Sequence, residues 1–283
     1  VYFSPNSMLS NVGASLFSNC KNLKTVIFGD RLTSLGANIF SGCVSLTEVH
    51  LPNALTSIPA SLFVNNSMLE NVNIPVSVTS IGANAFQNCV SLKSVTIPAK
   101  VRTIGQSAFA GCSALHTVVF ADGSRVTAIP ASAFDGATSL ASVNLSSSIT
   151  SVGNYAFRNT AITAISLKNV TSIGTEAFHG CASLKTAEVS GRLLTIGEKA
   201  FSGCAALESI NLTTGLKTIG EMAFADCTSL KSINLPSTLT TINKYAFYGC
   251  SALKSISIPD SVTYIGDNAF QNAGLTSVVL GLG

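Results

Sequence analysis

The chain has 283 residues, of which 47% are hydrophobic and only 10% charged, with a net charge of +3 and a mean hydropathy of +0.46. Because charged residues usually make up about 25% of a globular protein, a large apolar inventory must lie beneath a surface of Ser, Thr and Asn. No apolar run approaches the roughly 18 residues that cross a bilayer, and the dispersed cations lack interleaved aromatic residues. We therefore expect no membrane insertion by this segment and no nucleic-acid partner.

A repeat of 21 to 25 residues runs along the whole chain. A period in this range is the sequence signature of a solenoid. The repeat is marked by one phenylalanine in each of twelve units, at Phe17, Phe40, Phe63, Phe86, Phe109, Phe134, Phe157, Phe178, Phe201, Phe224, Phe247 and Phe270.

Each unit begins with a short strand. In a representative unit, Val95 and Ile97 alternate with Ser94 and Thr96, which is the period of two expected of a strand with one buried face. Strands that repeat in one direction must pair in parallel, and right-handed crossovers wind them into a right-handed coil.

A segment with a different period follows the strand. Gly105 supplies a change of direction, and Phe109, Cys112 and Leu115 then lie three residues apart, which predicts one side of a single helical turn. A single turn does not nucleate alone in water, so stacking of the coils must stabilise it, with each buried Phe contributing roughly 1.5–3 kcal/mol. We therefore predict an α/β solenoid with a parallel concave sheet and short helical turns on the convex side.

The order of Leu92, Val95, Ile97 and Pro98, followed by V-x-x-I-G and A-F-x-x-C, resembles the BspA-like, or Treponema-type, leucine-rich repeats over essentially the whole chain. The resemblance implies a right-handed leucine-rich-repeat superhelix. It also implies surface proteins of host-associated bacteria and certain protist parasites, used for attachment to host proteins or to other cells. The sequence departs from the pattern in two irregular units between residues 109 and 178, and where Cys is replaced at Asn66, Ala137, Thr160 and Ala273.

Both ends of the chain fall within the repeat pattern. Val1 and Phe3 match the strand positions of a preceding unit, and the chain stops just after Val278 and Leu280. Because terminal repeats normally need polar caps, we expect residues 1–283 to be a single leucine-rich-repeat solenoid and a fragment of a longer array that lacks its caps.

Several residue types have structural explanations. The eight cysteines share one column that other units fill with small residues, so we expect free buried thiols. We expect no disulfide framework and no metal site. The carboxylates of Glu176, Glu198, Glu221 and Asp267 stand near the starts of the predicted helical turns, where the helix dipole favours negative charge. A basic column is formed by Lys24, Lys93, Lys185, Lys231 and Lys254, which we interpret as a solvated edge.

The outward strand positions are the predicted contact surface, because the core does not dictate their side chains. The residue types at these positions vary most in the first units, at Ile27, Glu48, His50, Asn71 and Asn73. The full set of candidate ligand-binding residues is Ile27, Glu48, His50, Asn71, Asn73, Thr96, Val119, Asn144, Glu188 and Asn211. The alternative for these columns is a featureless polar sheet. A second candidate is the inserted turn at residues 121–124, read either as a local kink or as a recognition loop.

Taken with what the resemblance implies, these features predict an extracellular or cell-surface binding module, an adhesin or receptor-like segment whose partner is a protein, such as one of the host matrix or of a cell surface. The alternative is a structural spacer that presents another domain away from the cell. No catalytic group is apparent, because His50, His116 and His179 fall in different units and columns. We expect no enzyme activity and no cofactor.

Overall fold

The computed structural model describes residues 1–3 and 7–281. It is a parallel-strand β-solenoid of about 12 turns. Contacts divide the chain into two compact units, unit 1 (Val1–Ser148) and unit 2 (Ile149–Gly283), and each is described by itself. The expectation of a single domain stays a prediction.

The first strand series of unit 1 follows the predicted alternation. In β7, for example, Val95 and Ile97 are buried, whereas Ser94 and Thr96 are exposed. β2 pairs with β4, and β7 pairs with β9, which pairs with β11, all in parallel. The strands are β2 (Thr25–Ile27), β4 (Glu48–His50), β7 (Ser94–Ile97), β9 (Thr117–Phe120) and β11 (Ser142–Val143).

A second series of short strands was not predicted. It forms from the V-T-x-I-G part of each unit, and in unit 1 each of its two-residue strands buries one Val, Leu or Ile. Each coil of this kind is therefore held to its neighbours at two places. The strands are β1 (Asn11–Val12), β3 (Ser34–Leu35), β5 (Ser57–Ile58), β6 (Ser80–Ile81), β8 (Thr103–Ile104) and β10 (Ala128–Ile129).

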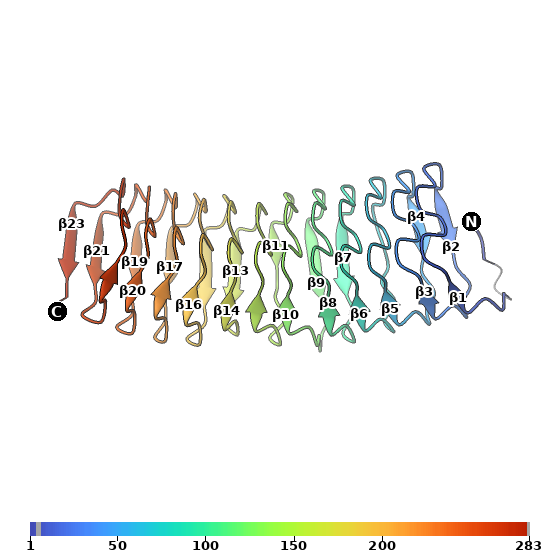
Figure 1. The fold of residues 1–283 in the computed structure, drawn as a ribbon, viewed down its shortest axis with the longest axis horizontal. Helices are drawn as coiled ribbons and strands as arrows, with labels where there is room; N and C mark the ends of the chain where they lie inside the picture. Colours follow the sequence, from blue (N-terminus) through green and yellow to red (C-terminus); the bar gives the residue numbers. More distant parts are fainter. Residues whose placement is uncertain (4–6, 282–283) are drawn as a thin grey trace. The chain divides into compact units, whose positions relative to one another are not determined.

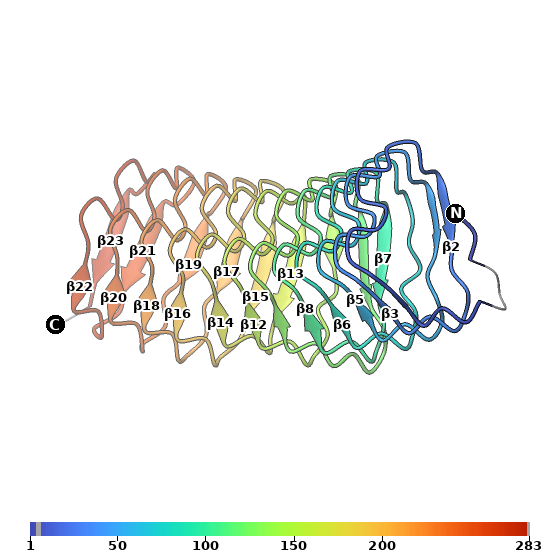
Figure 2. The same ribbon diagram turned by 45° about the vertical axis from the view of Figure 1, so that its right-hand side comes forward.

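Unit 2 repeats the same two series (Figure 1). The first comprises β13 (Ala164–Leu167), β15 (Thr186–Val189), β17 (Ser209–Asn211), β19 (Ser232–Asn234), β21 (Ser255–Ile258) and β23 (Ser277–Leu280). The second comprises β12 (Ser151–Val152), β14 (Ser172–Ile173), β16 (Thr195–Ile196), β18 (Thr218–Ile219), β20 (Thr241–Ile242) and β22 (Tyr264–Ile265). Successive coils of the unit lie over one another in the turned view (Figure 2), so equivalent residues form columns.

The phenylalanine rings form the predicted stack inside each unit. In unit 1 the centroids of Phe86 and Phe109 are 5.2 Å apart with ring planes 3° from parallel. In unit 2 the Phe201 and Phe224 rings are 5.6 Å apart at 3°. The rings from Phe40 to Phe247 are fully buried. Each stacked pair adds about 0.5–1.5 kcal/mol beyond simple burial, so the rings strengthen the apolar contact between coils.

The prediction of short helical turns is wrong. No α-helix occurs in the part of the chain that the structure describes. A helical N–H donates to the carbonyl four residues earlier. Here the N–H groups of Phe40 and Gly42 donate instead to Leu62 and Val64 of the next coil, at 3.1 and 2.8 Å. The N–H groups between these bond within their own coil instead and close tight turns, as when the Cys43 N–H donates to the Phe40 carbonyl over 3.1 Å. These turns place Phe, Cys and Leu three residues apart on one side.

Residues with a left-handed backbone conformation make successive N–H groups point alternately to the next coil and back into their own turn. Two residues after each of the twelve repeat phenylalanines, φ lies between 57° and 73°, and the position holds only Asn, Gly or Asp, the residue types that tolerate this conformation. A second left-handed column lies two residues before each phenylalanine. In unit 1 it holds Ser or Asn, but in unit 2 it includes Tyr155, Glu176, Lys199, Met222 and Tyr245.

Candidate binding surface on the strands

The first strand series of unit 1 presents the candidate contact residues outward. Among the five residues singled out first, Glu48, His50, Asn71 and Asn73 are exposed and Ile27 is half-buried. The side chains of Thr96, Val119 and Asn144 are exposed farther along the same unit, and Thr96 and Val119 are register partners. These seven exposed positions and Ile27 belong to one strand face, which we call the strand face of unit 1.

One open hollow of about 650 Å³ is lined by Ile27, Glu48, His50, Asn71 and Asn73. The hollow lies where the backbone pairing changes. β4 pairs with β2, whereas the next coil contributes only a single bridge between Asn71 and Ser94. Asn is disfavoured in strands, which explains why residues 71–73 do not form a ladder strand. The side chains at these positions therefore surround a recess that a flat sheet would not have.

Two further residues at the rim were missed by the sequence analysis. Asp30 and Asn53 also line the hollow, and the Asn53 amide donates to the Asp30 carboxylate over 3.4 Å. They follow the strands and so lie outside the two outward columns. Their spacing of 23 residues, one full coil, is the signal that could have identified them.

A hydrogen bond joins two side chains that line the hollow. His50 Nε2 lies 2.9 Å from Glu48 Oε1, and Thr25 donates to Glu48 Oε2 over 3.4 Å. The hydrogen bond from His50 is the main cause that lowers the pKa of Glu48 below its usual value. Both side chains remain more than half exposed, so a partner can reach a carboxylate that is already oriented.

Glu188 and Asn211 lie on the strand face of unit 2, where they are register partners in β15 and β17. Lys168 contacts Glu188 at 3.1 Å, and its hydrogen bond is the largest cause that lowers the pKa of that carboxyl group. A smaller hollow of about 300 Å³ lies farther along the unit, where the outward side chains are Ser232, Asn234 and repeated Ser. Unit 2 therefore presents a more uniform strand face.

The cysteine column is confirmed as free thiols, with one exception to its predicted burial. Seven cysteines are buried, and each donates its thiol to the carbonyl of the phenylalanine one coil earlier, as Cys112 does to Phe86 over 3.1 Å. Cys20 is exposed because no earlier phenylalanine turn covers it in the described residues. A small hydrogen-bond donor therefore fits this column, and Ala137 and Ala273 show that a small residue without a donor fits it too.

The helix-dipole explanation for the acidic residues is wrong, because these turns are not helical. Glu176 and Glu221 pair with cations of adjacent coils instead, and Glu198 lies 3.5 Å from the neighbouring Lys199. Glu176 lies 3.6 Å from Arg158 and 3.9 Å from Lys199, and Glu221 lies 3.1 Å from Lys244.

The basic column is also less basic than the sequence suggested. Lys93 pairs with Glu70 at 2.5 Å and Lys231 with Glu208 at 2.8 Å, and both carboxylates occupy the same column as the lysines. The mixed signs agree with the interpretation of a solvated edge.

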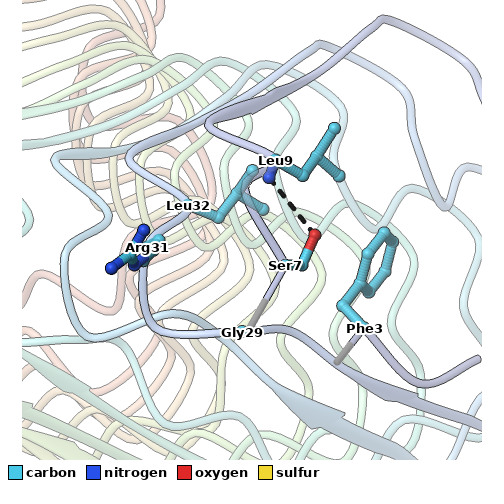
Figure 3. A pocket seen from close by; sticks show the side chains of 6 residues that line it. All are labelled: Phe3, Ser7, Leu9, Gly29, Arg31 and Leu32. Atoms are coloured by element: carbon cyan, nitrogen blue, oxygen red, sulfur yellow. Dashed lines mark hydrogen bonds between the residues drawn. The ribbon is translucent and has the colours of Figure 1, made fainter. Parts of the chain in front are cut away.

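A small cavity near the start of the chain has about 10 Å³, room for one water. Ser7, which accepts a hydrogen bond from the Leu9 amide, lines it together with Phe3 and Leu32 (Figure 3). No helix in the described residues is long and apolar enough to span a membrane. No group of three or more His, Cys, Asp or Glu side chains that could hold a metal ion occurs there.

Solved structures of bacterial leucine-rich-repeat proteins are similar to this chain. A leucine rich cell surface protein from Faecalibacterium prausnitzii is 31% identical with a TM-score of 0.61, and the alignment covers 97% of this chain and 83% of that one. A leucine-rich repeat protein from Bacteroides ovatus is 25% identical with a TM-score of 0.57, covering 96% and 84%. The pneumococcal vaccine antigen PcpA shares the fold at 21% identity and a TM-score of 0.58, covering 95% and 75%.

A comparison with curated proteins gave no match. A family model described as a BspA type leucine rich repeat region of six copies matches residues 2–116, 114–228 and 171–281. These ranges together span nearly the whole sequence. The chain therefore belongs to the BspA-type leucine-rich-repeat family.

Proposed function

We propose that this chain is an extracellular or cell-surface binding module and that the strand face of unit 1 contacts a protein partner. The observation that carries the proposal is the hollow of about 650 Å³ in which Ile27, Glu48, His50, Asn71 and Asn73 converge. A recess with a few placed polar groups is the usual form of a recognition site. The similarity to a protein described as a cell surface protein supports the location.

The chemistry of the hollow favours a polypeptide with a basic or amide-bearing segment. Glu48 and Asp30 supply carboxylates, and Asn53, Asn71 and Asn73 supply amides that both donate and accept. Charged hydrogen bonds of this kind give orientation as well as affinity. A matrix or cell-surface protein of the host fits this description, and the module acts by binding without catalysis.

A binding experiment tests the assignment to this face. The variant E48K/H50A/N71A/N73A should weaken binding to immobilised extracellular-matrix proteins or to whole cells about tenfold or more, because it removes the charge and the amides of the recess. The matched control, S232A/N234A/S255A, changes the strand face of unit 2 and should retain binding. Unchanged binding by the recess variant would refute the proposal, whatever the control does.

The uniform strand face of unit 2 favours a second role for that part of the chain. Its outward columns repeat Ser209, Ser232 and Ser255 beside Asn211 and Asn234, with few groups that could discriminate among partners. We infer that unit 2 acts as a spacer that holds unit 1 or another domain away from a surface. Replacing unit 2 with an unrelated rigid segment of the same length should then preserve attachment.

A further inference from the structure

Three basic side chains gather at one edge of unit 1. Lys100 and Arg102 flank the buried Val101 just before β8, and both are exposed. Arg125 is exposed in the following coil, beside the fully buried Val126. We call Lys100, Arg102 and Arg125 the basic triad.

The register of the coils brings these residues together. The coil between Phe109 and Phe134 is two residues longer than most, so that Val126 occupies the column of Val101. Arg125 therefore occupies the column of Lys100. Neighbouring strands are about 4.8 Å apart, and residues two apart in an extended segment are about 6.6 Å apart. The Cα atoms of Lys100 and Arg125 are consequently about 5 Å apart, and that of Arg102 lies within about 8 Å of both.

The two extra residues are accommodated in the turn beside the triad. Gly123 has φ of 75°, and a Cβ placed on it would meet no atom within 4 Å, so the tip of the turn projects from the surface. The insertion leaves the core undisturbed, because the Phe109 and Phe134 rings remain stacked at 5.5 Å and 6°. The inserted turn therefore changes the surface alone.

The triad has no counter-charge in the described part of the chain. No carboxylate lies within 4.0 Å of any of its three cations, including that of the neighbouring Asp122. Among the other cations of unit 1 in the described residues, Lys93 pairs with Glu70, whereas Lys21, Lys24 and Arg31 form no ion pair either but are spread over other coils. Like charges on adjacent strands repel one another, so an anionic ligand would relieve an unfavourable arrangement.

We propose that the basic triad binds an anionic linear polysaccharide. Two guanidinium groups and one ammonium group can hold sulfate or carboxylate groups along such a chain, with Arg able to bind them in a bidentate manner. Ser77 and Thr79 stand in the same columns one coil earlier. Their hydroxyl groups donate to backbone carbonyls of the preceding coil, and the remaining lone pairs can accept hydrogen bonds from sugar hydroxyls. Single-stranded nucleic acid fits less well, because it needs aromatic platforms and no Tyr or Trp lies in these coils.

The test uses a size-defined heparin oligosaccharide as the probe, with affinity measured by calorimetry at low and at moderate NaCl. The variant K100S/R102T/R125S places Ser or Thr at these positions. Other coils already carry the same residue types in the same columns, at Ser77, Thr79 and Ser148, so the variant should fold normally. It should bind at least about tenfold more weakly. The control K21S/K24S/K254S removes the same net charge from other exposed sites and should change affinity less than about threefold.

Two further probes distinguish the sources of negative charge. If a desulfated oligosaccharide binds as well as heparin, the triad contacts the carboxylate groups. If the desulfated oligosaccharide fails to bind, the triad contacts the sulfate groups. Both results support the proposal. Equal losses in the two variants would overturn it, because the attraction would then be diffuse. A single-stranded DNA oligonucleotide that binds the triad as tightly as heparin would also overturn it.

Discussion

Asn66 is the residue at which one substitution should make this protein more stable. Its side chain is fully buried, and neither Nδ2 nor Oδ1 has a hydrogen-bond partner in the described structure. It occupies the column in which seven cysteines donate to the phenylalanine carbonyl one coil earlier, as Cys89 does to Phe63 over 3.1 Å. Asn66→Cys should therefore replace an unsatisfied amide with a donor that points at the Phe40 carbonyl.

The expected gain follows from the polar groups involved. Burying an amide without a partner costs roughly 1–3 kcal/mol by mutational measures, and a thiol is a weak donor whose burial costs little. Because Asn and Cys differ little in volume, no cavity term of consequence opposes the gain. We expect Asn66→Cys to raise the local free energy of opening by about 1–3 kcal/mol.

Hydrogen exchange measured by mass spectrometry is the suitable assay, because solenoids open coil by coil. Peptides covering residues 60–72 should gain protection in Asn66→Cys, while peptides from unit 2 should not change. The reciprocal variant Cys89→Asn should lose protection by a similar amount. If Asn66→Cys leaves exchange unchanged or faster, the amide must be satisfied by an internal water, and the reasoning fails.

Three other substitutions or treatments test the fold. Phe201→Ala should destabilise unit 2 by about 3–5 kcal/mol, since its ring stacks on Phe178 and Phe224; a thermal-unfolding shift no larger than that of Leu194→Ala, at an exposed site, would contradict this. Met222→Asn should stabilise by roughly 0.5–1 kcal/mol in urea titrations, because φ of 53° strains Met more than Asn; a loss of stability would count against the strain. Burial raises the pKa of Cys112 to about 12 and of Cys181 to about 11, so iodoacetamide at pH 8 should modify only the exposed Cys20 rapidly; early modification of buried cysteines would disprove the packing.

The strand positions and the phenylalanine stack could be predicted because both depend on short-range patterns. Val95 and Ile97 alternate with polar residues, and the phenylalanines recur at nearly constant intervals, so local sequence determines which side chains face inward. The second strand series was missed because its strands are two residues long. Segments that short show no periodicity that sequence reasoning can detect.

The turn segment was assigned wrongly because a spacing of three has more than one cause. Helices and successive tight turns both place residues i and i+3 on one side. The decisive signal was present two residues after each phenylalanine, where only Asn, Gly or Asp occurs, as at Asn65, Asn88 and Gly111. Those residue types share a tolerance for positive φ. Regular helices would not require such a residue at the same position of every repeat.

The candidate contact residues could be placed on a face from the sequence, but the recess that five of them line could not. Exposure of Glu48 and His50 follows from strand alternation. The hollow depends on the interruption of pairing at Asn71 and on Asp30 and Asn53 at its rim, which are tertiary relations between coils. Sequence columns therefore indicate which side chains are available for binding, and the backbone pairing determines where they can act together.

The irregular coil shows how such a scaffold can change its surface at little cost in stability. The phenylalanine carbonyls and the alternating N–H groups of the turn segment connect each coil to the next, so two extra residues there would disrupt several hydrogen bonds. Placed in the turn at residues 121–124, the same insertion leaves Phe109 N–H donating to Ala133 over 2.9 Å, as in regular coils. Insertions are consequently tolerated at the edge between the two strand series, and that edge is where new recognition groups such as the basic triad can be added without changing the core.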